Sequence, residues 1–513
     1  MKLFGGKQMK KKLTAALIFA FSFVLVIAGC GNEKTNSTQK QEKEEKEAEV
    51  VSGASQTNYT PYEELKDSYD IIIVGAGGAG MTAALEAQAK GLNPVIFEKM
   101  PVAGGNTTKA SSGMNASETK FQKEQGIEDN NDLFYEETLK GGHGTNDKEM
   151  LRFFVDNSAS AIEWLDTIGI RLNNLTITGG MNEKRTHRPE DGSAVGQYIV
   201  DGLLKNVQEK DIPLFVNAEV KGITEKDGTV NGVDVLFNQT DEKSITAKAV
   251  IVTTGGFGSN MDMIKEVRSD LGDYVTTNQA GSTGDGIKMI EKLGGATVDL
   301  EQIQVHPTVQ QEESYLIGEA VRGEGAIMVS AEGKRFTNEL DTRDKVTAAI
   351  NELPEKSAYL VFDSGVKSRA KAIEQYEKLG FVLEGETIEA LAEKMNVSSE
   401  ELKVTLDTWN KAVTNKDDQA FGRTTGIEND LASAPFYAIK IAPGIHYTMG
   451  GVKINTNTEV LNEDGQPISG LFAAGEVTGA LHGENRIGGN SVSEIIIFGR
   501  QAGIKSADYV KAQ

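Results

Sequence analysis

Residues 69–80 have the sequence YDIIIVGAGGAG, in which an apolar, β-branched run leads directly into a glycine-rich turn. The run 69–74 is typical of a buried parallel strand, and residues 81–90 after the turn have a helical pattern. Gly75, Gly77 and Gly80 form G-x-G-x-x-G. These glycines permit the turn, a close backbone approach to a pyrophosphate, and close helix–strand packing, respectively. The segment therefore predicts a dinucleotide site at the first strand of a doubly wound fold.

The next strand strengthens this interpretation. Residues 93–97 form a second apolar run that ends at Glu98, about 20 residues after the turn, where a carboxylate accepts hydrogen bonds from a ribose diol. Similar strand–turn units follow at 249–254 and 470–474, each leading into glycine. The predicted fold class is α/β, with a Rossmann-like cofactor domain built on a parallel sheet.

The chain of 513 residues is too long for one core, so two domains are expected. The middle of the chain has long helical patterns, such as 367–379 and 387–394, and lacks the strand–glycine–helix rhythm. We interpret it as an inserted α+β capping domain that holds the substrate. The expected divisions are 67–301 and 447–513 for the two parts of the cofactor domain, and 302–446 for the capping domain.

The N-terminal segment has the features of a secretory signal. Lys10, Lys11 and Lys12 precede an apolar run from Leu13 to Ala28, which is short for a membrane span. The run ends in Ile-Ala-Gly-Cys at 27–30, which resembles a bacterial lipobox. We expect a lipoprotein signal peptide over 1–29, lipidation of Cys30, and a lipid-anchored protein on the extracellular face of the cytoplasmic membrane. An uncleaved anchor is the alternative, and either Met1 or Met9 is the true start. The polar, charged residues 30–66 predict a flexible tether.

Composition excludes several classes of site. The formal charge of -22 argues against a nucleic-acid partner, whose phosphates need a basic surface. With one cysteine, the chain can form no internal disulfide, no cysteine-ligated iron–sulfur cluster and no CxxCH haem attachment. We predict no metal site.

Cations nevertheless gather in glycine-rich, non-periodic segments, which indicates a pocket for an anion. They are Arg322, Arg343, Arg486, His306 and His446. We expect Arg335 and Arg369 to be surface charges, and His143, His187 and His482 to have structural roles only.

Residues 98–107 (EKMPVAGGNT) and 112–115 (SGMN) resemble the FAD-binding segment of the fumarate reductase and succinate dehydrogenase flavoprotein family. Residues 283–286 (TGDG) and 473–477 (AAGEV) match further segments, and the resemblance covers about 67–510. It is closest to the soluble fumarate reductases of the flavocytochrome c type. No histidine stands near Asn106–Thr108, where membrane-bound relatives attach FAD, so the FAD is expected to be non-covalent. The resemblance implies that FAD contacts Gly75, Gly77, Ala79, Gly80, Glu98, Lys99, Gly105, Asn106, Thr107, Ser112, Gly113, Met114, Val220, Asp285, Tyr447, Glu476, Ser491 and Val492.

The same resemblance implies roles for the cation cluster. Arg343 is the proton donor, and Glu319 and Arg322 relay protons to it. One substrate carboxylate binds to His446 and Arg486, and the other to His306, with Gln304 and Gly489 also in the substrate site. The implied reaction is reduction of fumarate to succinate, with hydride from FAD N5, as a terminal step of anaerobic electron transfer.

One departure bears on the substrate. The family often has threonine before the relay glutamate, where it helps to hold the second carboxylate, and this chain has Gly318. A related branch that reduces urocanate has tyrosine where this chain has His306, which favours a dicarboxylate. Two alternatives stay open: a urocanate or other enoate reductase on the same fold, and a non-catalytic flavin electron-shuttle lipoprotein.

Electrons must reach the FAD from outside, because the haem domain of the soluble relatives is not found in this sequence. Residues 49–57 (EVVSGASQT) resemble the target of bacterial flavin transferases, which would attach FMN covalently to Ser55. Glu49 replaces the usual aspartate, and a plain Ser/Gly linker is the alternative. The implied partners are a flavin transferase, a quinone-linked or flavin-based donor at the membrane, and the membrane itself through the lipid anchor.

Overall fold

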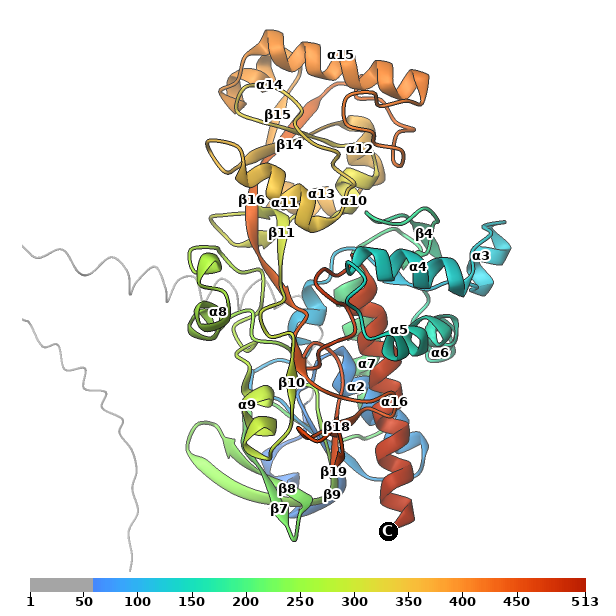
Figure 1. Ribbon diagram of the computed structural model, residues 1–513, viewed down its shortest axis with the longest axis vertical. Helices are drawn as coiled ribbons and strands as arrows, with labels where there is room; N and C mark the ends of the chain where they lie inside the picture. The colour runs from blue at the N-terminus through green and yellow to red at the C-terminus, as the bar shows by residue number, and fades with distance from the viewer. Residues whose placement is uncertain (1–58) are drawn as a thin grey trace, which may run out of the picture. The chain divides into compact units, whose positions relative to one another are not determined.

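The computed structural model describes residues 59–513 and contains two hydrophobic cores. Five parallel strands form the centre of the first core. Ile71, Ile72 and Ile73 on the central strand are fully buried, as expected for a strand covered on both faces. The predicted α/β class and the predicted parallel sheet are confirmed (Figure 1). In spatial order the five strands are β6 (Leu214–Phe215), β2 (Pro94–Phe97), β1 (Ser68–Val74), β9 (Asp241–Val252) and β19 (Pro467–Ala473).

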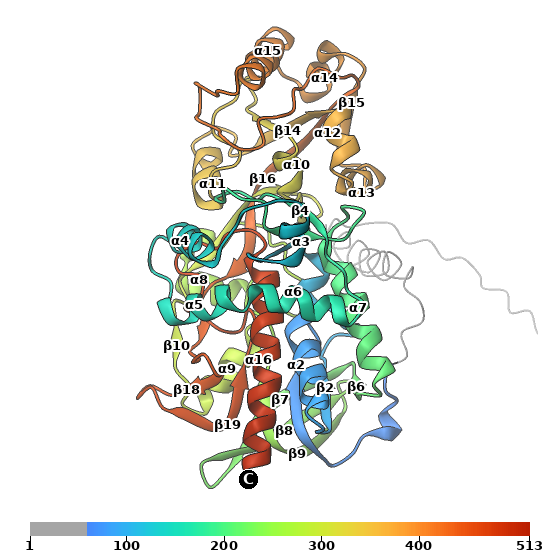
Figure 2. The same cartoon turned by 90° about the vertical axis from the view of Figure 1, so that its right-hand side faces the viewer.

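Two helices lie side by side against this sheet, α2 (Gly78–Ala89) and α16 (Asn490–Ala512), as Figure 2 shows. Their contact depends on small residues, since a Cβ on Gly503 would lie 2.3 Å from the Ala83 carbonyl oxygen. The C-terminal helix therefore returns to the glycine turn at the start of α2, although more than 400 residues separate them in sequence. Antiparallel strands β7 (Ala218–Lys226) and β8 (Thr229–Phe237) extend the sheet beyond β9.

A second hydrophobic core is built from residues between Ile317 and Ile441. A six-stranded sheet contributes strands to this core and is formed by β11 (Ile303–Gln310), β12 (Tyr315–Leu316), β13 (Ile327–Val329), β14 (Ala358–Asp363), β15 (Val382–Gly385) and β16 (Phe436–Thr448). Its helices are α10 (Ala320–Gly323), α11 (Arg343–Asn351), α12 (Ser364–Arg369), α13 (Ala372–Lys378), α14 (Ile388–Met395) and α15 (Ser399–Asn415).

The antiparallel strands β11 and β16 pass between the two cores (Figure 1). Ile303 and Ile445 on these strands belong to the first core, whereas Ile439 and Ile441 on β16 belong to the second. Side chains at this crossing can therefore contact residues of both cores.

Helices and short strands complete the fold around these two cores. A three-stranded sheet is formed by β3 (Met114–Asn115), β5 (Thr186–Arg188) and β4 (Asn174–Thr176). The other elements are η1 (Tyr62–Glu64), η2 (Gly105–Lys109), α3 (Lys120–Glu124), α4 (Asn131–Gly141), α5 (Lys148–Asp156), α6 (Ser158–Thr167), α7 (Val195–Glu209), α8 (Met261–Val267), η3 (Ser269–Leu271), α9 (Asp285–Lys292), β10 (Thr297–Val298), β17 (Gly451–Val452) and β18 (Glu459–Leu461).

Two local expectations need correction. The helix predicted over 367–379 is two helices, because the chain leaves helical geometry at Ala370 and α13 then directs Ile373 and Tyr376 into the second core. Residues 59–66, expected to be part of the tether, pack on the first core through Tyr59, Tyr62 and Leu65.

The predicted signal peptide, Cys30 and Ser55 lie outside the described residues. Within 59–513, no helix is long and apolar enough to cross a membrane.

Candidate active site

The glycine turn between β1 and α2 shows the close backbone approaches that its motif predicts. Gly75 has a φ of +105°, and a Cβ there would lie 2.6 Å from the Thr253 carbonyl oxygen. A Cβ on Gly80 would lie 2.0 Å from the Gly75 carbonyl oxygen, so only glycine lets α2 pack this closely on the turn. The first N–H groups of such a helix lack partners within the helix, which favours an anionic group such as a pyrophosphate.

A cavity lies against this turn. A carboxylate at a strand end, a glycine turn and a helix N-terminus meet in its walls, and this set matches the ribose and pyrophosphate of a dinucleotide. The residues present therefore fit FAD. The predicted cofactor residues that line the cavity are Gly75, Gly77, Ala79, Glu98, Lys99, Gly105, Asn106, Thr107, Val220, Asp285 and Glu476.

Glu98 is buried at the end of β2, beside the turn. Its carboxylate accepts backbone N–H groups from Ala76 and Met100, each at 2.8 Å. Burial raises the pKa of Glu98, against the lowering effect of these donors. The two N–H groups orient the carboxylate at the position from which it can accept ribose hydroxyls.

Polar contacts join distant segments elsewhere in the cavity wall. Asn106 donates from Nδ2 to the Glu476 carboxylate at 3.2 Å, and the Thr448 N–H donates to the other oxygen at 3.1 Å. Burial raises the pKa of Glu476 to about 7. Lys99 Nζ donates to Asp285 Oδ2 at 2.5 Å. These contacts bring together residues that lie up to 370 positions apart.

Seven predicted cofactor residues are not among the side chains that line this cavity: Gly80, Ser112, Gly113, Met114, Tyr447, Ser491 and Val492. Met114 is fully buried on β3, and Tyr447 donates its hydroxyl proton to Glu494 Oε2 at 2.5 Å. Ser491 and Val492 lie in the first turn of α16. Their contact with FAD remains a prediction.

Arg343 is the centre of a buried polar network. Its Nε donates to Glu319 Oε1 at 2.6 Å and its Nη1 to Gln304 Oε1 at 2.7 Å. Arg322 Nη2 lies 3.5 Å from the same Glu319 oxygen, because α10 places the two side chains three residues apart on one face. The structure therefore brings the predicted proton donor and both relay residues into contact.

The predicted carboxylate ligands lie beside this network. β11 carries His306 and β16 carries His446, and their rings are 5.1 Å apart. The Arg486 guanidinium packs over the Tyr447 ring at 4.3 Å and donates from Nη1 to the Ile487 carbonyl. Its Nε is buried, and no group in the described part of the chain accepts a hydrogen bond from it. A buried donor without an acceptor is available for a ligand.

Electrostatics assign the charges in the cluster. Burial lowers the pKa values of His306 and His446 well below the usual range, and Arg343 lowers both further. Burial alone would raise the pKa of Glu319, but Arg343 and Arg322 together lower it to about 2. The imidazoles are therefore neutral near pH 7, Glu319 is ionised, and the arginines provide the positive charge.

The loop before α16 closes tightly on this network. Gln304 Nε2 donates to the Arg486 carbonyl at 2.6 Å, which positions the loop. Gly489 has a φ of +86°, and a Cβ on Gly488 would lie 2.3 Å from Glu319 Oε2 and 2.9 Å from Arg343 Nη2. Gly488 was not predicted as a site residue, although its glycine-rich segment was a usable signal.

Thr178 is a second residue that sequence reasoning missed. Its hydroxyl donates to Glu319 Oε2 at 2.5 Å, so both relay oxygens are occupied. Thr178 lies on the loop between β4 and β5, and the two partners are 141 residues apart. Only the adjacent glycines at 179 and 180 hinted at an unusual backbone there.

The prediction that Arg335 is a surface charge is wrong. Its side chain is only 5% exposed and pairs with Glu339 at 2.8 Å and with Asp418 at 3.0 Å. It also packs over the Trp409 ring at 4.8 Å. Arg369 is half-exposed and bonds Glu324. His187 and His482 are buried, with Thr119 and Glu494 as hydrogen-bond partners, and His143 is an exposed partner of Asp344 and Glu484.

Comparison with known proteins agrees with this geometry. Residues 70–492 match the FAD binding domain family. The NADH:fumarate oxidoreductase of Klebsiella pneumoniae (strain 342) is 50% identical over 440 residues, covering 86% of this chain and 48% of that protein. A fumarate reductase (cytochrome) of Shewanella frigidimarina is 40% identical over 446 residues, covering 87% of this chain and 78% of that protein. The urocanate reductase of Eggerthella lenta is 32% identical, covering 87% and 75%.

A solved structure has the same fold. The open conformation of a flavocytochrome c3 fumarate reductase superposes with a TM-score of 0.72 and 38% identity, covering 91% of this chain and 81% of that one. The present chain spans about half the length of the Klebsiella protein and about three quarters of the Shewanella protein. On the matched FAD domain and these relatives, the chain belongs to the FAD-binding flavoprotein family that includes the fumarate reductases.

Proposed function

We propose that this chain is an FAD-dependent fumarate reductase that converts fumarate to succinate. The observation that supports the proposal most strongly is the arrangement of Arg343, which is held between Glu319 and Gln304 beside the incompletely bonded Arg486. The names of the relatives point to the same reaction.

Substrate binding would begin at Arg486. Its unpartnered Nε and the neutral His446 imidazole can donate hydrogen bonds to one carboxylate. Thr277 Oγ1 lies 2.8 Å from His446 Nδ1 and orients the ring. Fixed donors of this kind stabilise the negative charge that develops next to the carboxylate more than they stabilise the ground state.

Proton delivery would use Arg343. Bound FAD would supply the hydride for the reduction. The Arg343 guanidinium then gives a proton to the neighbouring carbon. An arginine can do so because a carbanion is far more basic than a guanidine. Glu319 and Arg322, both in contact with this network, would return a proton to Arg343.

Two other functions compete with this proposal. A urocanate or other enoate reductase would share the proton network, and the Eggerthella relative is named for urocanate. A flavin electron-shuttle lipoprotein would bind flavin without reducing an enoate, but it has no use for a buried donor–relay set.

A panel of acceptors separates these functions. The purified flavin-loaded protein, reduced anaerobically by a dye, is offered fumarate, urocanate, acrylate and crotonate. We expect kcat/KM for fumarate to exceed every other value by tenfold or more, about the discrimination that one charged contact provides. Higher efficiency with urocanate would favour the second function. Flavin binding without oxidation of reduced dye by any enoate would favour the electron shuttle.

We also propose that the chain works at the extracellular face of the cytoplasmic membrane, anchored through Cys30, as a terminal step of anaerobic electron transfer. Covalent FMN on Ser55, attached by a flavin transferase, would carry electrons from a quinone-linked or flavin-based donor to FAD. The lipobox and the 49–57 segment support this proposal. An unmodified Ser55 peptide in the mass spectrum of mature protein, from cells that contain a flavin transferase, would remove the FMN step.

A further inference from the structure

Buried arginines divide into two groups. Among the described residues, five have a carboxylate oxygen within 4 Å: Arg185, Arg322, Arg335, Arg343 and Arg423. The other two have none: Arg188 and Arg486. Arg486 is the expected ligand of a substrate carboxylate, and Arg188 has no role in the site described above.

Arg188 is the last residue of β5 and is 3% exposed. One Nη donates to the Ser193 carbonyl at 3.2 Å, and its buried Nε finds no acceptor within residues 59–513. A Cβ on Gly113 would lie 2.9 Å from Arg188 Cγ, so the side chain passes directly against the 112–114 segment. Burial lowers the pKa of Arg188, and the charges of Tyr376, Glu324 and Asp191 act in the opposite direction.

Two hydroxyl groups lie close to Gly318, the residue before Glu319. Tyr376 interacts electrostatically with Arg188, and its hydroxyl accepts the Gly318 N–H at 3.0 Å. A Cβ on Gly318 would lie 2.7 Å from Ser111 Oγ and 3.5 Å from the Tyr376 hydroxyl. Gly318 directly precedes Glu319. The absence of a side chain at 318 therefore lets both hydroxyls reach the wall of the catalytic site.

Both hydroxyls have donor capacity to spare. In the described part of the chain, no acceptor takes the Tyr376 proton, and the half-buried Ser111 hydroxyl has no hydrogen-bond partner. A buried guanidinium without an anion is strongly unfavourable unless a ligand completes it. Arg188, Tyr376 and Ser111 together offer a cation and two O–H donors, which is a complement for a carboxylate.

We propose that Arg188, Tyr376 and Ser111 form a second anion subsite that binds the far carboxylate of an unsaturated dicarboxylate. This inference rests on the proposed enoate reduction. The charges of the residues around the site also support a second anion subsite. Both histidines of the cluster are neutral, Arg322 and Arg343 share the Glu319 carboxylate, and Arg486 serves one end of the substrate. A further buried guanidinium would help to hold a dianion, and Arg188 is one that has no carboxylate oxygen within 4 Å among the described residues.

The test compares a dianion with a monoanion of similar shape. Binding of succinate and of butyrate to the oxidised, flavin-loaded protein is measured by calorimetry, for wild type, Arg188→Gln and Ser111→Ala. We expect Arg188→Gln to weaken succinate binding tenfold or more and Ser111→Ala to weaken it about threefold to tenfold, with butyrate binding unchanged in both. In turnover, KM for fumarate should rise by similar factors, while kcat changes less.

Controls make each outcome decisive. Arg152→Gln removes an exposed arginine that pairs with Asp132 and should leave both affinities unchanged. Flavin absorbance reports folding, and Ser111→Ala, a small truncation, tests the subsite if Arg188→Gln does not fold. Equal losses for succinate and butyrate, or no loss for succinate, would overturn the subsite. If wild type binds succinate through Arg188 but reduces no enoate, the proposed function fails while the subsite stands.

Discussion

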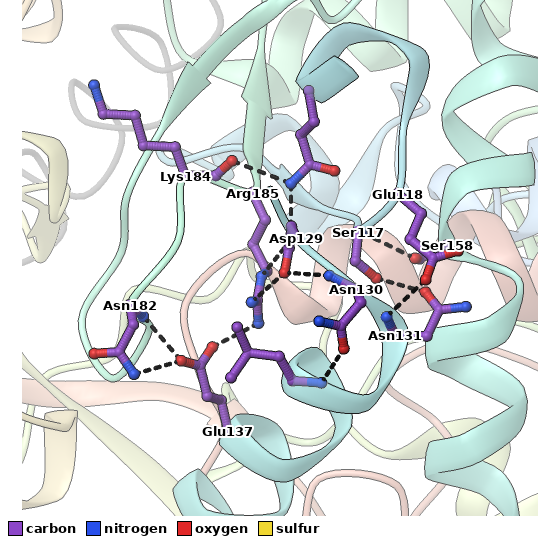
Figure 3. A network of polar contacts seen from close by, with 12 residues as sticks. Ser117, Glu118, Asp129, Asn130, Asn131, Glu137, Ser158, Asn182, Lys184 and Arg185 are labelled. Carbon is purple, nitrogen blue, oxygen red and sulfur yellow. Dashed lines mark hydrogen bonds and ion pairs between the residues drawn. The ribbon is translucent and has the colours of Figure 1, made fainter. Parts of the chain in front are cut away.

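The Arg185 cluster and the Arg486 cluster are both buried, yet they are completed differently. Arg185 donates to both oxygens of Asp129, at 3.0 and 2.7 Å, and to Glu137 at 2.6 Å (Figure 3). The second Glu137 oxygen accepts two N–H groups from Asn182. Arg486 donates to one carbonyl at 3.1 Å, and its buried Nε has no acceptor within residues 59–513. The Arg185 cluster is completed by groups of the chain itself, whereas Arg486 keeps a buried donor available for a ligand.

The difference separates support from chemistry. The Arg185 cluster ties the loop between β4 and β5 to α4, and that loop carries Thr178 to Glu319. The cluster therefore supports the network around Arg343 indirectly, through this loop. The Arg486 cluster leaves donors unfilled, and desolvated donors of this kind stabilise charge that develops during a reaction.

Removal of the proton donor should have the largest effect. We expect Arg343→Ala to lower kcat for fumarate by about 100- to 10,000-fold, because general acid catalysis supplies that range. Flavin content should be preserved, since the Arg343 side chain does not line the cofactor cavity. Steady-state kinetics with a reduced dye provide the measurement. A loss of less than tenfold would contradict the assignment of Arg343.

Breaking the completed cluster should change stability instead. We expect Arg185→Met to lower the free energy of unfolding by about 3–5 kcal/mol, because Asp129 and Glu137 would remain buried without their cation. In the folded fraction kcat should fall less than tenfold, because the cluster acts on the network only through the loop that carries Thr178. Arg152→Met is the control, because Arg152 pairs with Asp132 on the surface, and its removal should cost about 1 kcal/mol at most. Equal destabilisation of Arg185→Met and Arg152→Met in urea titrations would contradict the distinction between the buried cluster and a surface ion pair.

A smaller effect, on the pH dependence of stability, is expected from Glu476, which lines the cofactor cavity. Its pKa is about 7 in the folded state against 4.5 for the free side chain. The contribution of protonated Glu476 to the stability of the folded state is fully present below pH 4.5. It is lost as pH rises through 7, because the unfolded chain releases the proton first. The flavin-free protein should therefore lose up to about 3 kcal/mol between pH 4.5 and 8 from this group. In Glu476→Gln this part of the slope should disappear. Urea titrations at pH 4.5 and pH 8 measure the free energy of unfolding. The same pH-dependent loss in wild type and in Glu476→Gln would show that Glu476 is ionised at both pH values.

Local pattern was sufficient for much of the fold and part of the site. The β1–turn–α2 unit and the Glu98 position follow from neighbouring residues, so they could be recognised from short stretches of the sequence. The cations that meet at Arg343 were also recognisable, because each stands in a glycine-rich segment. The helix break at Ala370 was not recognisable, because it depends on which side chains the second core accepts.

The chain's own pattern therefore specified the cofactor turn and the supply of cations, since glycine geometry and charge are properties of single residues and near neighbours. Tertiary structure alone decided which arginines are neutralised. Arg335 pairs with Asp418, 83 residues away, and Thr178 reaches Glu319 across 141 residues, whereas Arg188 and Arg486 have no carboxylate partner in the part of the chain that the structure describes. Pairing depends on distance in space and on burial, and neither is fixed until the two cores have packed around β11 and β16.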